Sequence, residues 1–160
     1  MKPRAFETIV YGGLSIAILD FFDAVTFFGL YLGVPFTRIW QGVSSGLLGQ
    51  DAAVSGGWST ALLGILLHFV VAMLIALVYY LIAGRSTYVL SHPIISGIVF
   101  GTVAYFVMNY LVIPLSAIGE MPSFRLSRFL NGVIGHIFLV GIPVALIAKW
   151  SAAKDQNANH

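Results

Sequence analysis

Apolar stretches recur four times along the chain, separated by short polar segments. One of them, residues 61–83, carries no charge and is long enough, at about 1.5 Å per residue, to cross the roughly 30 Å hydrocarbon core of a bilayer. The others cover residues 9–34, 94–115 and 129–148. This pattern predicts an all-α polytopic membrane protein, with four transmembrane helices in one bundle.

The segment between the first two spans, residues 35–52, is too short and too polar to cross a bilayer. Its apolar residues recur at helical spacing, with Arg38 and Gln41 between them. This spacing predicts a short amphipathic helix lying in the membrane interface, anchored by Trp40. The alternative is an irregular loop packed on the bundle, because glycines within the segment disfavour a helix.

Composition agrees with a membrane location and limits the classes of function. The chain is 59% hydrophobic and only 9% charged, whereas soluble domains are about 25% charged. Its length allows one domain, residues 1–150, followed by a polar tail, residues 151–160. A net charge of +2 does not suggest nucleic-acid binding. Because the sequence contains no cysteine, disulfides, thiolate metal sites and cysteine nucleophiles are excluded.

Lysines and arginines predict the orientation of the spans. One face of the predicted bundle carries five of them: Lys2, Arg4, Arg85, Lys149 and Lys154. The opposite face carries three: Arg38, Arg125 and Arg128. Because basic residues concentrate in cytoplasmic loops, we expect both termini in the cytoplasm.

Every predicted span contains a polar residue near mid-depth. These residues are Asp20, Asp23, His68, Asn109 and His136. Counted from the span midpoints, the last four lie within roughly 5 Å of one level. An unpaired carboxylate at this depth costs at least about 2.5–3.5 kcal/mol. We therefore predict one buried polar cluster, in which the histidines are the partners of the aspartates.

Several roles are open to this cluster. It can supply hydrogen bonds between helices, worth about 0.6 kcal/mol each on average, or handle protons or ions. Two histidines at one depth on two helices of a bundle can also ligate a haem, although aspartates beside an apolar porphyrin are unfavourable. His68, His136 and Asp23 form a zinc set by residue type. No H-E-x-x-H motif supports a metal, and no base is evident beside Ser44 and Ser45. The cofactor is therefore unassigned, and the sequence does not indicate an enzyme.

Four motifs carry a resemblance to a known group of proteins. They are R-x-x-Q-x-x-x-S-G-L-L-G at residues 38–49, L-G-x-L-L-H-F at 63–69, MNYLVIPLS at 108–116 and G-H-x-x-x-V-G-x-P-x-A-L at 135–146. In these motifs the chain resembles a family of small four-span bacterial membrane proteins to which no activity is assigned. The resemblance covers most of the chain and implies a bacterial inner membrane.

Three functions fit these observations. The first is a small transporter or proton-conducting module, which needs a water path to the polar cluster. The second is a non-enzymatic assembly or accessory subunit of a larger membrane complex, and the third is a haem-binding electron carrier. Because four short helices enclose little volume, we expect a path through one protomer to be hard to build. Gly97 and Gly101 form a GxxxG pair that allows close helix approach. A homodimer formed through glycine-rich faces would relieve the limit on volume.

Overall fold

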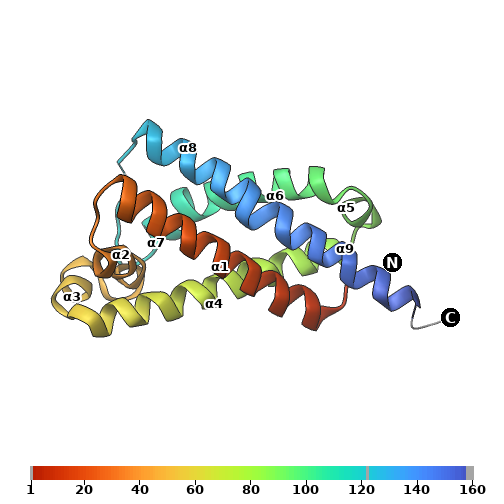
Figure 1. The fold of residues 1–160 in the computed structure, drawn as a ribbon, viewed down its shortest axis with the longest axis horizontal. Helices are drawn as coiled ribbons and strands as arrows, with labels where there is room; N and C mark the ends of the chain where they lie inside the picture. Colours follow the sequence, from red (N-terminus) through yellow and green to blue (C-terminus); the bar gives the residue numbers. More distant parts are fainter. Residues whose placement is uncertain (1, 122, 158–160) are drawn as a thin grey trace.

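The computed structural model describes residues 2–121 and 123–157, and it places four long helices side by side with both termini at one end (Figure 1). The first is built from η1 (Glu7–Tyr11), α1 (Gly12–Ala24) and η2 (Val25–Tyr31), where η denotes π-helical turns. The second is α4 (Gly57–Ala83). The third joins α6 (Pro93–Val107), η3 (Met108–Val112) and α7 (Ile113–Leu115), and the fourth joins α8 (Leu126–Gly135), η4 (His136–Gly141) and α9 (Ile142–Asn157).

These four helices are long and apolar enough to cross a membrane, so the predicted four-helix bundle is confirmed. Their bounds differ from the predicted spans mainly at the ends. The first helix ends at Tyr31 rather than at residue 34, because Gly33 has a positive φ of 70° and Pro35 follows it. The second helix starts at Gly57, and the last begins at Leu126 and continues to Asn157.

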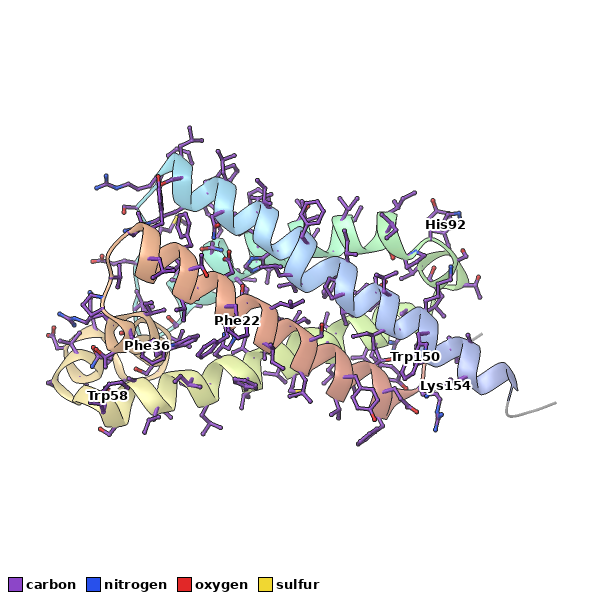
Figure 2. The ribbon with its side chains drawn as sticks, viewed as in Figure 1. Phe22, Phe36, Trp58, His92, Trp150 and Lys154 are labelled. Atoms are coloured by element: carbon purple, nitrogen blue, oxygen red, sulfur yellow. The ribbon has the colours of Figure 1, made fainter. Side chains whose placement is uncertain are left out.

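Side-chain size separates the inside of the bundle from its outside. On α4, large apolar side chains are exposed at every fourth residue: Leu62, Leu66, Val70, Leu74 and Val78. The buried face of the same helix carries mainly small residues: Ala61, Gly64, Ala72, Ala76 and Ala83. Trp58, at the start of α4, is 62% exposed (Figure 2). This arrangement is that of a membrane bundle, in which large side chains face lipid and small ones allow close helix packing.

α6 packs closely on η4 and on the start of α9. A Cβ atom added to Gly97 would lie 2.7 Å from Cα of Ile142, and one added to Gly101 would lie 2.8 Å from Cα of Ile137. Gly141 faces the same two glycines from the other side. The predicted close approach at Gly97 and Gly101 therefore occurs inside the protomer, so this face does not support a homodimer.

Two of the π-helical segments are followed by a proline. η3 comes just before Pro114, and η4 comes just before Pro143. Proline has no N–H and its ring crowds the carbonyl four residues earlier, so the regular hydrogen-bond ladder is interrupted there. As a result Asn109 and His136, two of the predicted cluster residues, both lie on π-helical turns.

Three short helices complete the chain: α2 (Phe36–Leu48), α3 (Gln50–Ser55) and α5 (Thr87–Ser91). Figure 1 shows α2 almost end-on, so that it crosses the direction of the four long helices. It packs so closely on α4 that a Cβ atom at Gly64 would overlap the backbone of Trp40. The amide of Ala117 also donates a 2.9 Å hydrogen bond to the carbonyl of Gly46. Thus α2 is held between the first two spans and the loop that follows the third.

The structure corrects the predicted anchoring role of Trp40. The segment is helical, as the periodicity predicted, and Arg38 is exposed. The side chain of Trp40, however, is only 1% exposed, and its ring stacks on Phe21 with centroids 4.5 Å apart. Gln41 is buried too and donates a 2.9 Å hydrogen bond to the carbonyl of Gly57. The face of α2 that is buried against protein therefore carries Trp40, Gln41, Ser44 and Ser45, whereas Phe36, Leu47 and Leu48 are exposed.

Candidate functional site

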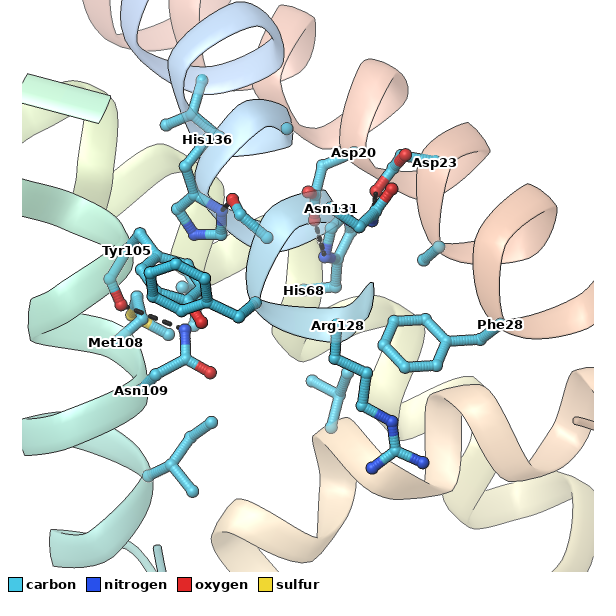
Figure 3. A pocket seen from close by; sticks show the side chains of 18 of the residues that line it. Asp20, Asp23, Phe28, His68, Tyr105, Met108, Asn109, Arg128, Asn131 and His136 are labelled. Carbon is cyan, nitrogen blue, oxygen red and sulfur yellow. Dashed lines mark hydrogen bonds and ion pairs between the residues drawn. The ribbon is translucent and has the colours of Figure 1, made fainter. Parts of the chain in front are cut away.

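A cavity of about 480 Å³ lies between the four long helices, toward the end of the bundle that carries α2. All five residues of the predicted polar cluster line it: Asp20, Asp23, His68, Asn109 and His136. Each of them is half-buried. Figure 3 shows their side chains converging from different helices. The expectation that four short helices enclose little volume is therefore wrong for this chain.

The first pair in the cavity is Asp20 with His68. Nδ1 of His68 lies 3.8 Å from Oδ2 of Asp20, while Nε2 lies 2.9 Å from the carbonyl oxygen of Ala17. A carbonyl oxygen only accepts hydrogen bonds, so Nε2 carries a hydrogen and donates it. The atom of His68 that faces Asp20 is consequently Nδ1, at a distance that allows an ion pair but is too long for a direct hydrogen bond.

Asp23 has a different partner from the one predicted. Its Oδ2 atom accepts a 2.8 Å hydrogen bond from Nδ2 of Asn131, a residue of α8. The two residues lie 108 positions apart in sequence, so this bond ties the first span to the fourth. No histidine among the described residues lies within ion-pair distance of Asp23.

The remaining two cluster residues bond to their own helices. Nδ1 of His136 donates a 3.0 Å bond to the carbonyl of Gly132, and Nδ2 of Asn109 donates a 3.0 Å bond to the carbonyl of Tyr105. Because Nδ1 of His136 holds the hydrogen, Nε2 of the neutral ring is an acceptor. The rings of His136 and Tyr105 pack edge to face, with centroids 5.5 Å apart. Nε2 of His136 and Oδ1 of Asn109 are therefore acceptor atoms that can bind other partners.

Sequence reasoning missed several residues that line the cavity, above all Tyr105, Arg125, Arg128 and Asn131. Arg128 and Asn131 are exposed and half-buried, respectively. A spacing signal was present, because Arg128, Asn131 and Gly135 follow one another at i, i+3 and i+7 and so share one face of a helix. That face looks into the cavity.

The candidate metal and haem roles find little support in these contacts. Among residues 2–121 and 123–157, no three histidine, aspartate or glutamate side chains are placed to hold a metal ion. The zinc set of His68, His136 and Asp23 is therefore not assembled. Nε2 of His68, an atom that a haem iron would need, bonds to Ala17.

Two short serine motifs also occur in the chain, but the structure does not place them as nucleophiles. Residues 42–46 match G-x-S-x-G, yet they lie within α2 rather than on a strand-to-helix turn, and the buried hydroxyl of Ser44 donates to the carbonyl of Gln41. Residues 151–154 match S-x-x-K. There the Ser151 hydroxyl donates to Ala148, and the ammonium of Lys154 lies 4.0 Å from the ring centroid of Trp150.

The fold and the cavity together define a multi-pass α-helical membrane protein, with a cavity among its spans whose largely apolar walls carry a few polar and charged side chains. No protein-family model, curated protein sequence or solved structure matches the chain. The resemblance of its four motifs to small bacterial membrane proteins therefore stays a prediction.

Proposed function

We propose that the protein is a small transporter or proton-handling module, in which the Asp20–His68 pair takes up a proton from the cavity. The observation that carries this proposal is the 3.8 Å approach of His68 Nδ1 to Asp20 Oδ2 within a cavity of about 480 Å³. Such a cavity is many times larger than the roughly 30 Å³ that one water molecule occupies in the liquid. Water can therefore reach the pair, which is what proton exchange requires.

The geometry of the pair suits the exchange of one proton. With Nε2–H committed to Ala17, Nδ1 of neutral His68 presents a lone pair toward the carboxyl group of Asp20. If Asp20 is also ionised, a lone pair faces a negative charge, and the contact is repulsive. One added proton, on either Nδ1 or Oδ2, makes the contact attractive. A carboxyl and an imidazole so arranged within membrane helices are typical of proton relays.

We further propose that the protein lies in a bacterial inner membrane with both termini in the cytoplasm. Support comes from the five basic residues predicted at the terminal end of the bundle against three at the other end. With this orientation the cavity lies toward the outer side of the membrane. Protons would then enter the cavity from outside the cell.

Proton flux into liposomes tests the proposal. The purified full-length protein is reconstituted with a pH-sensitive dye inside, and a pH gradient is applied together with a potassium ionophore. We expect wild-type flux well above that of protein-free liposomes, and at least a tenfold loss for Asp20→Asn and for His68→Gln. The glutamine amide can still donate to Ala17, so His68→Gln removes proton exchange while keeping that bond.

The matched control is Asp51→Asn, because Asp51 is an exposed aspartate on α3 outside the cavity. It should leave the flux unchanged. A wild-type flux equal to that of protein-free liposomes, or full flux in Asp20→Asn, would contradict the proposed function.

A further inference from the structure

The charges that line the cavity are separated by sign. Asp20 and Asp23 lie on α1, deep in the bundle, whereas Arg125 precedes α8 and Arg128 lies in its first turn. Among the described residues, neither arginine has a carboxylate within ion-pair distance. Figure 3 shows the Arg128 side chain pointing away from Asp20 and Asp23. The cavity thus presents a negative inner part and a positive part near α8.

Helix geometry relates the two charged parts. Asn131 donates its 2.8 Å bond to Asp23, and Arg128 precedes Asn131 by three residues on the same helix. Three residues correspond to about one helical turn, or roughly 4.5 Å along the axis. Because the Arg128 side chain points away from Asp23, a molecule that contacts both residues must span this turn and the length of the arginine side chain.

The size and the remaining lining of the cavity also suit a small molecule. Ligand sites typically enclose about 300–1,000 Å³ and combine apolar walls with a few polar groups. Here the rings of Phe28, Tyr105 and Phe129 contribute to the walls, and such rings also attract ammonium groups. A bare proton needs none of these features.

We infer that the cavity binds a small zwitterion, with a primary ammonium at Asp20 and Asp23 and a phosphate or carboxylate at Arg128. A simple cation would leave Arg128 unpaired and be repelled by it, and a simple anion would be repelled by the two aspartates. A zwitterion satisfies both parts and adds no net charge to a site within the membrane. This inference rests on the proposed function, for which it names the class of substrate or ligand.

Ammonium–phosphate chemistry can come from a free solute or from a lipid headgroup. The soluble probe is O-phosphoethanolamine, compared with ethanolamine and inorganic phosphate by titration calorimetry on the purified full-length protein. The lipid probe is phosphatidylethanolamine, compared with phosphatidylglycerol by native mass spectrometry. Binding of the soluble zwitterion identifies a free solute, whereas selective retention of phosphatidylethanolamine alone identifies a headgroup.

We expect the matching zwitterion to bind at least tenfold more tightly than either of its halves or than the anionic lipid. Arg128→Gln should remove this preference without weakening ethanolamine binding, and Asp23→Asn should remove it without weakening phosphate binding. The controls are Arg38→Gln and Asp51→Asn, because both residues are exposed and lie outside the cavity. These two variants should bind as the wild type does.

The inference is overturned if neither zwitterion is preferred over its halves or over phosphatidylglycerol, or if the preference survives in Arg128→Gln. Proton flux then separates the two proposals. Flux without zwitterion preference keeps the proton-handling function and removes the ligand. Zwitterion preference without flux keeps the binding site and removes the proton-handling function.

Discussion

Replacing Gly101 by alanine should destabilise the bundle at the close crossing of α6 and η4. The new Cβ would lie 2.8 Å from Cα of Ile137 and closer still to the carbonyl oxygen of His136. Ordinary contacts of a Cβ atom begin at 3.4 Å. Because both neighbours are backbone atoms of the fourth span, no side chain can rotate away, and α6 and η4 must separate by at least about half an ångström.

The magnitude follows from two opposing effects. Overpacking of this kind typically costs about 1–3 kcal/mol. Alanine gains up to about 1 kcal/mol over glycine in helix propensity, but a helix within the bilayer has little freedom to unfold, so this gain is small. We therefore expect a loss of about 2–3 kcal/mol. For a chain of this length that corresponds to a fall in Tm of roughly 4–12 °C.

Thermal unfolding of the purified protein in detergent, followed by tryptophan fluorescence, measures this change. The matched control is Gly42→Ala, because Gly42 lies within α2 and a Cβ atom there would meet nothing within 4 Å. Its Tm should stay equal to that of the wild type or rise slightly. If Gly101→Ala unfolds at the same temperature as Gly42→Ala, the crossing of α6 and η4 is not as close as described.

Two further stability predictions concern α2 and the terminal end of the bundle. Trp40→Ala should lower the free energy of unfolding by about 3–5 kcal/mol, because it removes a buried ring. Trp58→Ala, at an exposed position, should lower it far less. Equal losses of Tm in the two variants would contradict the burial of Trp40 on α2. Ser151→Ala should lower the free energy of unfolding by about 1–3 kcal/mol, because it removes the 3.0 Å hydrogen bond to the buried hydroxyl of Thr8. Chemical denaturation should show this loss, and it should show no loss for the exposed control Ser55→Ala.

The four-helix bundle was predictable because each span carries its own signal. A long apolar run such as residues 61–83 has no stable place outside a membrane, so hydropathy alone assigns it. The periodicity of residues 36–48 likewise predicted the helix α2. It did not predict which surface that helix covers, because lipid and protein interiors are similarly apolar, and Trp40 suits either environment.

The candidate site was predictable in its depth but not in its pairing. The depth of a residue follows from counting along its span. This count predicted one level for Asp23, His68 and His136, and all three line one cavity. Pairing depends on the rotation of each helix about its own axis, which the sequence does not specify. Asn131 was overlooked because it lies only five residues after the start of α8, close to the expected span end, where polar residues are common.

Asp20 and Asp23 separate the functional role of the cluster from a purely structural one. Asp23 bonds to the neutral amide of Asn131, as residues that only join helices do, and an asparagine at position 23 can accept the same bond through its own amide oxygen. An accessory subunit held together by such bonds should therefore tolerate Asp23→Asn. Among the residues that the structure describes, Asp20 has no such donor, and it faces His68 instead. If Asp20→Asn keeps the wild-type Tm yet abolishes proton flux, the carboxyl group of Asp20 acts in proton exchange and not in holding the fold.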